Sequence, residues 1–132
     1  MRIDLADLKT LHYRVENAGE EGVAVMTLDR AETRNAQNRR MTYEMNACYD
    51  DAVARSDVKV IVLQADGPHF CSGHDNGDRE PLSTFDRVFP VADPHLDGQE
   101  GNMALEEEVY LQMTWRWRNL PKPVIAAAQG KT

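Results

Sequence analysis

The stretch Gly67-Pro68-His69-Phe70-Cys71-Ser72-Gly73-His74-Asp75 gives the strongest indication of fold and function in this chain. It follows Val58-Lys59-Val60-Ile61-Val62-Leu63, a β-branched run typical of a central strand. A strand that leads into a glycine-containing loop can leave backbone N–H groups unpaired and directed outward. Such groups can stabilise a developing negative charge, and losing one donor typically slows a reaction by about 10²–10³. Most loops with two glycines are plain turns. The loop is therefore interpreted either as a plain turn or as a segment whose N–H groups stabilise negative charge.

The residues before this loop predict a hairpin. Leu11, Tyr13 and Val15 alternate with polar residues, as in a half-buried strand, and residues 23–28 form a more apolar strand. Residues 19–22 have the composition of a turn between them. We therefore expect the two strands to pair.

Two helices are predicted. Asn38 is suited to cap a helix that ends near Arg55. A second helix is expected from Met103 or Ala104 to about Asn119, because prolines follow it at 121 and 123. The expected buried faces consist of Met41, Met45, Cys48 or Tyr49, and Ala52 in the first helix, and of Leu105, Val109, Met113 and Trp117 in the second.

A small apolar strand at residues 124–128 completes the order strand-strand-helix-strand-helix-strand. This order predicts an α/β fold with crossover connections. Residues 76–101 are punctuated by prolines and a glycine, and we expect a mobile, partly helical excursion there. Residues 106–108, three glutamates, are interpreted as a solvated helix start. Trp115 and Trp117 point to different helix faces, so one is expected in the core and the other at an interface or pocket wall.

The composition is that of a globular protein and limits the function classes. A net charge of −7 over 132 residues argues against broad nucleic-acid binding. No apolar run approaches the length of a membrane span, and the acidic N-terminal residues do not resemble a signal peptide, so a cytoplasmic location is expected. Cys48 and Cys71 are too few for a disulfide framework, and reduced thiols are expected.

Several side chains admit more than one interpretation. Four arginines lie close together in this acidic chain, and they form either a solvated helix start or a local phosphate contact, namely Arg30, Arg34, Arg39 and Arg40. The histidines, cysteine and aspartate of residues 69–75 fit no standard zinc spacing, so no metal site is predicted. Cys71 as a nucleophile would need a base whose position the sequence does not guarantee.

The loop at residues 67–75 resembles the G-x-x-F-x-x-G-x-D segment of the enoyl-CoA hydratase/isomerase (crotonase) superfamily. Three further pieces resemble the family in the same order and spacing. They are Val25-Met26-Thr27-Leu28-Asp29-Arg30 with Arg34-Asn35-Ala36, then Val58 to Leu63, and Pro121-Lys122-Pro123-Val124-Ile125-Ala126-Ala127-Ala128-Gln129-Gly130. The resemblance covers residues 11–130 apart from the excursion at 76–101.

This resemblance implies a crotonase-like spiral of ββα units, with residues 1–132 as the N-terminal part of a single domain that is incomplete at its C-terminus. It implies an enoyl-CoA hydratase, a lyase that acts on a coenzyme A thioester. The thioester carbonyl would accept two backbone N–H bonds that stabilise an enolate-like intermediate. The family also implies no tightly bound cofactor, coenzyme A as part of the substrate, and a homo-oligomer (a trimer or hexamer), without nucleic-acid or membrane partners.

By motif position, the resemblance makes the backbone N–H of His74 the first oxyanion donor. Arg34 and Ala36 fall where the family contacts the pantetheine and phosphates of coenzyme A. The loop motif also implies Gly73 as a binding residue, and it places Ser72, Asp75 and Asn76 near the adenine end.

Two departures from the family bear on function. The imidazole of His74 is bulkier than the small residue of many members, and we expect it to alter the acyl pocket. The second oxyanion donor and the usual glutamates lie beyond the position of Gly130, and residues 106–108 do not replace them by motif position. We therefore expect residues 1–132 alone not to hydrate a substrate, and an exposed apolar edge at residues 124–128.

The alternatives are a non-catalytic fragment or pseudoenzyme that binds coenzyme A or self-associates, or another activity of the superfamily. Those activities include isomerase, acyl-CoA hydrolase and dehalogenase chemistry. The acyl group remains open.

Overall fold

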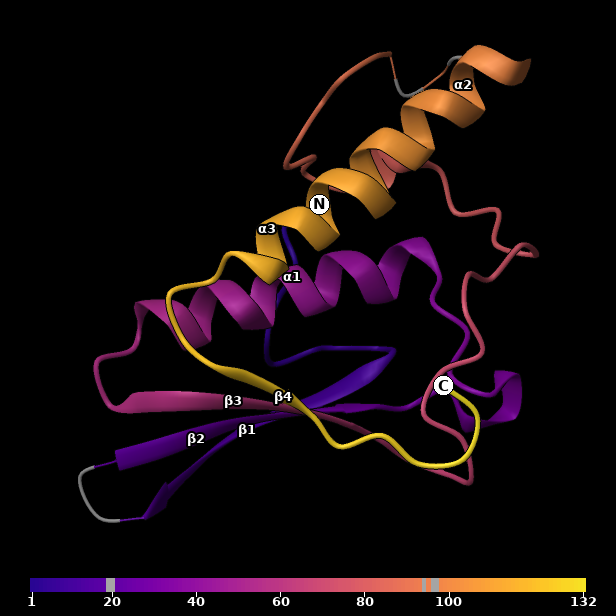
Figure 1. Ribbon diagram of the computed structural model, residues 1–132. Helices are drawn as coiled ribbons and strands as arrows, with labels where there is room; N and C mark the ends of the chain where they lie inside the picture. Colours follow the sequence, from indigo (N-terminus) through magenta and orange to yellow (C-terminus); the bar gives the residue numbers. More distant parts are fainter. Residues whose placement is uncertain (19–20, 94, 96–97) are drawn as a thin grey trace.

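A four-stranded sheet forms one layer of the molecule (Figure 1). The computed structural model describes residues 1–18, 21–93, 95 and 98–132. Strands β1 (Leu11–Ala18) and β2 (Glu21–Leu28) pair antiparallel, so the predicted hairpin pairing is confirmed, while residues 19 and 20 of the predicted turn lie outside the described residues. Strands β3 (Val58–Ala65) and β4 (Val124–Ala126) add in parallel, giving the order β1-β2-β3-β4. The predicted α/β fold with crossover connections is confirmed.

Helix α1 (Arg39–Ala54) connects β2 to β3 and covers one face of the sheet (Figure 1). The side chain of Asn38 accepts a hydrogen bond of 2.9 Å from the backbone N–H of Met41, so the predicted N-cap is confirmed. The predicted apolar face of α1 is also confirmed, because these side chains are buried: Met41, Met45, Cys48, Tyr49 and Ala52.

The second helix is longer than the sequence predicts. It begins as α2 (Gly98–Leu105), continues as the π-helical segment η3 (Glu106–Gln112) and ends as α3 (Met113–Arg118). The prediction of a start near Met103 was wrong because residues 98–102 are polar and carry no apolar periodicity. Figure 1 shows this long helix on the side of α1 that faces away from the sheet.

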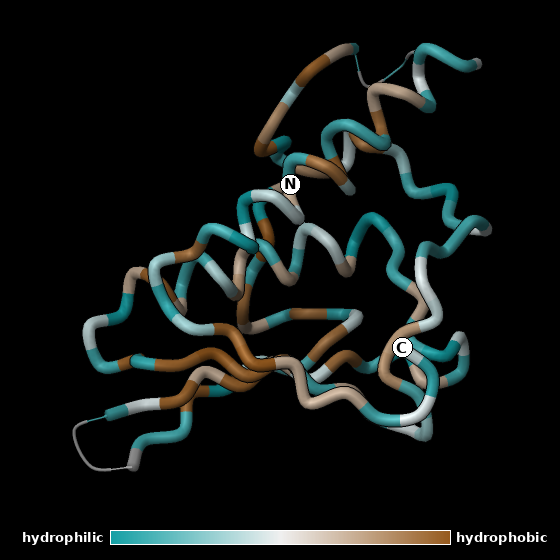
Figure 2. The backbone as a smooth tube through the Cα atoms, in the orientation of Figure 1, coloured by the Kyte–Doolittle hydropathy of each residue, from teal (hydrophilic) through white to brown (hydrophobic). Residues whose placement is uncertain are grey.

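Two apolar clusters hold these layers together. One lies between the sheet and α1, and Figure 2 shows the hydrophobic residues concentrated along the strands. The other joins α1 to the long helix and to the excursion, which includes the 3₁₀ turn η2 (Leu82–Thr84). Trp117 packs against both clusters, whereas Trp115 is 62% exposed. The prediction that one of the two tryptophans packs against the core is therefore confirmed for Trp117, and a position of Trp115 at an interface stays a prediction.

Strand β4 forms an open edge of the sheet. Val124 and Ile125 are 39% and 55% exposed, which confirms the expected apolar edge. The strand ends at Ala126, two residues before the predicted end, although Ala127 still donates a backbone hydrogen bond of 2.8 Å to Leu63. Among the helices of the described residues, none combines the length and apolar character needed to cross a membrane.

Candidate active site

Three loop segments meet at the carboxyl ends of the parallel strands: residues 30–37 after β2, 67–75 after β3 and 129–131 after β4. This edge of an α/β sheet is where ligands usually bind. Phe70 donates a backbone hydrogen bond of 2.8 Å to Gln129, and Ser72 donates one of 3.1 Å to Arg34. Figure 1 shows the C-terminal residues beside the loop that follows β3. These three segments are called the loop cluster below.

The buried side chain of Asn35 holds the loop cluster together. Its amide donates hydrogen bonds of 2.9 Å and 2.8 Å to the carbonyls of Asp66 and His69. Its side-chain oxygen accepts a hydrogen bond of 2.8 Å from the backbone N–H of Arg30. Asn35 and Arg34 both have left-handed backbone conformations, with φ of 54° and 55°. Such conformations are uncommon outside glycine, and the three hydrogen bonds of Asn35 maintain them.

The backbone N–H of His74 is directed away from Gln37. Gln37 donates a backbone hydrogen bond of 2.8 Å to the carbonyl of Gly73, and Asp75 donates one of 2.9 Å to the carbonyl of Gln37. Because N–H groups alternate in direction along extended chain, the N–H of His74 points to the opposite side. It donates no hydrogen bond to any other described residue. This arrangement is the one that an oxyanion donor requires.

Two glycines allow the loops to approach each other. Gly73 has a φ of 99°, and a Cβ added there meets no atom within 4 Å, so the requirement is conformational. Gly130 has a φ of 60°, and a Cβ added there would lie 2.0 Å from the carbonyl oxygen of Pro68. Any other residue at 130 would push the third segment away from the loop.

The imidazole of His74 stacks on the ring of Tyr110 in η3, with ring centroids 3.5 Å apart and planes 12° from parallel. Sequence reasoning missed this contact because the two residues belong to elements far apart in the chain. Burial, reinforced by the nearby Glu106, raises the pKa of Tyr110 above its ordinary value. The phenol is therefore neutral at ordinary pH and acts here as an aromatic surface.

Three of the four clustered arginines are engaged with acidic residues rather than with solvent. Arg30 lies 2.9 Å from Asp75, Arg39 lies 3.8 Å from Asp78, and Arg40 pairs with Glu80. Their side chains are only 16%, 20% and 21% exposed. The interpretation as a solvated helix start was therefore wrong for these three.

Arg34 differs from the other arginines of the cluster. It is exposed, and its side chain makes no hydrogen bond or ion pair with another described residue. Its guanidinium remains available to a phosphate. Of the four arginines, Arg34 is therefore the one to which the interpretation as a phosphate contact still applies.

The remaining predicted binding residues lie in or next to the loop cluster. Ser72 lies against residues 33 and 34, and its hydroxyl donates a hydrogen bond of 3.3 Å to the carbonyl of Thr33. Ala36 is partly buried and Asn76 is exposed. The carboxylate of Asp75 is occupied, because it also accepts a hydrogen bond of 3.0 Å from the backbone N–H of Gly77. Asp75 therefore holds the loop as well as flanking the site.

Glu108 corrects the interpretation of residues 106–108 as a solvated helix start. Its side chain is fully buried, while Glu106 is exposed. The hydroxyl of Tyr43 donates a hydrogen bond of 2.6 Å to Glu108, and Arg87 donates one of 2.7 Å from Nε. This contact raises the pKa of Arg87 above its ordinary value. The countercharge comes from the excursion, and nothing in the local sequence indicates it.

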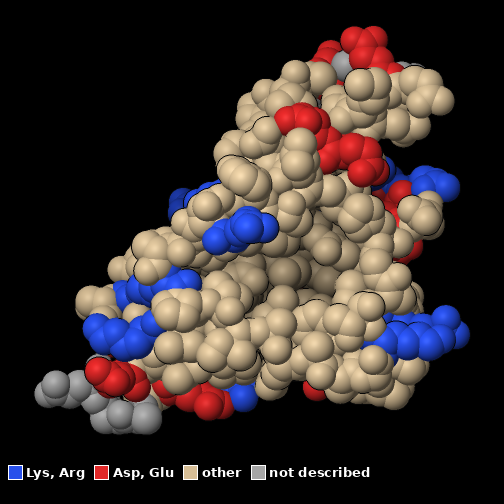
Figure 3. Space-filling view, viewed as in Figure 1, with Lys and Arg blue, Asp and Glu red and all other residues tan. Residues whose placement is uncertain are grey.

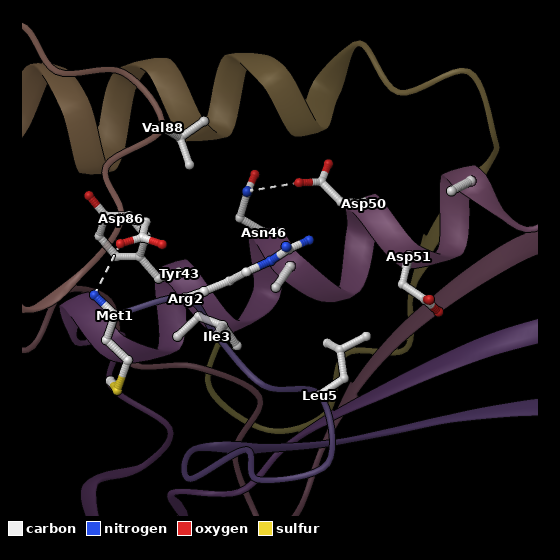
Figure 4. A pocket seen from close by; sticks show the side chains of 12 residues that line it. Met1, Arg2, Ile3, Leu5, Tyr43, Asn46, Asp50, Asp51, Asp86 and Val88 are labelled. Atoms are coloured by element: carbon white, nitrogen blue, oxygen red, sulfur yellow. Dashed lines mark hydrogen bonds and ion pairs between the residues drawn. The ribbon is translucent and has the colours of Figure 1, made fainter.

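Other groupings lie away from His74. A cavity of about 430 Å³ lies between the N-terminal residues and α1, with Arg2 extending along it toward Asp50 (Figure 4). None of the predicted site residues lines it. Within the described residues, one group of potential metal ligands lies together on the surface, composed of His12, Asp29 and Asp66. Figure 3 shows a separate hollow between the long helix and the sheet, with walls that are mostly uncharged.

The comparison with protein families decides which family this arrangement represents. The family described as enoyl-CoA hydratase/isomerase matches residues 18–132. The chain belongs to the enoyl-CoA hydratase/isomerase family. EchA13 of Mycobacterium tuberculosis, provisionally named an enoyl-CoA hydratase, is 35% identical over 90% of this chain and 39% of its own length. The 1,2-epoxyphenylacetyl-CoA isomerase of Escherichia coli is 30% identical over 84% of this chain and 38% of its own length.

Solved structures agree with this family assignment. The structure titled as a probable enoyl-CoA hydratase from Mycobacterium smegmatis has a TM-score of 0.70 and 36% identity, over 92% of this chain and 41% of that chain. A probable enoyl-CoA hydratase from Mycobacterium thermoresistibile has a TM-score of 0.69 and 37% identity, with the same shares covered. The crotonase-like fold predicted from the motifs is confirmed. The chain spans about two fifths of the length of these relatives.

Proposed function

We propose that this chain binds coenzyme A thioesters as part of an enoyl-CoA hydratase, with the N–H of His74 as one donor to the thioester carbonyl. The observation that carries the proposal is the unpartnered, outward N–H of His74. Its neighbours on both sides are fixed by hydrogen bonds to Gln37. A donor fixed before the reaction stabilises the negative charge of an enolate without reorganising.

Coenzyme A would lie along the outer side of the loop cluster. Arg34 offers a free guanidinium to its phosphates, with Ala36 beside the pantetheine. Ser72, Asp75 and Asn76 would lie near the adenine end, and Gly73 would also contact coenzyme A. In this proposal coenzyme A enters as part of the substrate, and no further cofactor is required.

We propose that residues 1–132 form the first part of a single domain, with residues 76–101 as its variable segment. Hydration would need the carboxylates that the family places beyond the position of Gly130, since water and the acyl carbon both exchange protons. Residues 129–131 run beside the loop after β3, which supports a second donor close by. The exposed apolar residues of β4 offer an edge against which the rest of the domain would pack. We expect a homo-oligomer and a cytoplasmic protein.

A pair of substitutions at one position tests the donor. His74→Pro removes the N–H, and no hydrogen bond to a described residue is lost with it. His74→Ala keeps the N–H and removes the imidazole. By calorimetric titration, we expect the wild type to bind butanoyl-CoA more tightly than coenzyme A. We expect His74→Ala to keep this preference by a smaller margin, and His74→Pro to bind the two equally. A proline variant that folds and still prefers the thioester would refute the donor role.

Isomerisation is the second candidate, because a relative at 30% identity is named as an acyl-CoA isomerase. Both reactions can pass through an enolate held by the same donors, so the loop cluster does not separate them. Liquid chromatography with mass spectrometry of an enoyl-CoA after incubation with the protein does, since hydration adds the mass of water and isomerisation gives a new peak of unchanged mass. A product without added water would favour the isomerase.

A further inference from the structure

We propose that Tyr110 is a positioning residue for the oxyanion donor, because its ring fixes the imidazole of His74 and thereby the direction of the His74 N–H. This inference rests on the proposed role of His74. It assigns a function to the bulky residue by which this chain departs from many members of its family.

The backbone alone leaves His74 only partly restrained. The hydrogen bonds to Gln37 hold Gly73 and Asp75, on either side of it. Gly73 has no side chain to limit its rotation, and a Cβ added there would meet no atom within 4 Å. His74 itself is exposed. A contact made by the His74 side chain can therefore restrain the rotation of the backbone in this part of the loop.

The stack on Tyr110 provides such a contact. A centroid separation of 3.5 Å with planes 12° from parallel places the two rings face to face. Aromatic pairs in contact typically contribute enough to change a conformational equilibrium by about two- to tenfold beyond the area they bury. Holding the imidazole in one place restricts the rotation of the peptide that carries the donor.

Tyr110 is itself held on a well-anchored turn. It lies in the π-helical segment η3, a kind of irregularity often found at functional sites. The residues before it, Glu108 and Val109, are fully buried. Glu108 is bonded to Tyr43 of α1 and to Arg87 of the excursion. The backbone that carries the Tyr110 ring is therefore anchored to α1 and to the excursion.

Nuclear magnetic resonance of the ¹⁵N-labelled protein tests this role with three variants. Tyr110→Leu removes the ring, and Tyr110→Phe keeps it without the hydroxyl. Trp115→Leu is the matched control, because it removes an exposed aromatic ring from the same long helix. The readouts are the order parameter of the His74 amide without ligand, and the affinities for butanoyl-CoA and for coenzyme A.

We expect Tyr110→Leu to lower the His74 order parameter from a rigid value of about 0.85 to below about 0.6. We also expect it to weaken butanoyl-CoA binding about three- to tenfold with coenzyme A binding unchanged. Tyr110→Phe and Trp115→Leu should match the wild type. An equally rigid His74 amide in Tyr110→Leu would overturn the inference.

The two readouts separate this inference from the proposed function. If the wild type does not prefer the thioester over coenzyme A, the donor role of His74 fails. The ligand-free order parameter would then still decide whether Tyr110 fixes the loop.

Discussion

The loop cluster and the excursion are fastened to the molecule by different interactions. In the loop cluster, backbone hydrogen bonds and the amide of Asn35 join segments at the ends of three strands. The excursion is joined to the helices by ion pairs, with Arg40 on Glu80 and Arg87 on Glu108. Backbone bonds follow once the strands pair, whereas an ion pair depends on two charges that the fold happens to bring together. The excursion should therefore depend more strongly on its ion pairs than the loop cluster does, although Arg30 and Asp75 also pair within the loop cluster.

Removing Glu108 gives the largest expected effect. Glu108→Ala leaves the charge of Arg87 and the hydroxyl of Tyr43 without their partner, and breaking a buried ion pair in this way costs about 3–5 kcal/mol. Urea unfolding measures this change. The matched control is Glu106→Ala, at an exposed position of the same segment, with an expected change below about 0.5 kcal/mol. Equal effects would mean that the buried pair does not hold the excursion.

Removing Asn35 gives the next effect, and it falls on the loop cluster. Asn35→Ala leaves one N–H and two carbonyls without a partner, for which we expect a loss of about 3 kcal/mol in the free energy of unfolding. Asn38→Ala, a second asparagine with only a capping role, should lose about 1 kcal/mol. Thioester binding should also weaken in the Asn35 variant alone. If Asn38→Ala impaired binding as strongly, the loop cluster would not depend specifically on Asn35.

The free energy of unfolding should decrease at alkaline pH because of Cys48, which is buried in the core beneath both regions. Burial raises the pKa of the Cys48 thiol well above its ordinary value, and Glu44 and Asp51 add to the effect. The folded protein therefore keeps a proton that the unfolded chain loses above about pH 8.5. The stabilisation from the protonated thiol is fully present below that pH. Above it, the free energy of unfolding falls by about 1.4 kcal/mol per pH unit. Between about pH 8 and 10, the free energy of unfolding of Cys48→Ala should fall less steeply with pH than that of the wild type. An equally steep fall in both proteins would exclude Cys48 as the source of the pH dependence.

The smallest expected effect concerns the charge of Arg34. Arg34→Ala should leave the free energy of unfolding unchanged within about 0.5 kcal/mol, because the side chain has no partner among the described residues. Its affinity for coenzyme A should fall about fivefold, less so at high salt, since an exposed charge–phosphate contact is screened. Arg30→Ala should instead destabilise the loop. A coenzyme A affinity that does not change in Arg34→Ala would remove this residue from the binding site.

The sequence predicted best those features that depend on local pattern. The hairpin, the cap at Asn38 and the buried face of α1 follow from periodicity and side-chain hydrogen bonding within a few residues. The loop after β3 followed from a motif. The burial of Glu108 did not follow, because its partner Arg87 lies on another segment. Consecutive glutamates are predicted to be exposed to solvent unless a positive charge on another segment is known to pair with one of them.

The same limit applies to the site. Motif position predicts site roles for His74 and Arg34, and the structure adds how the surroundings of the two residues differ. Nothing in the sequence indicates that Tyr110 meets the imidazole of His74, or that Arg30 turns inward to Asp75. Both contacts join elements whose relative position depends on the packing of the long helix and on the turn after β2.

The donor role of His74 can be observed at the thioester carbonyl itself. We would record the ¹³C resonance of butanoyl-CoA, labelled at the thioester carbonyl, free and bound to the protein. A carbonyl held by the fixed N–H of His74 is polarised more strongly than in water. We predict a downfield shift on binding that is smaller in His74→Ala, which keeps the N–H but loses the stack on Tyr110, and that disappears in His74→Pro. A bound carbonyl with the same resonance as in water would show that His74 donates no such hydrogen bond.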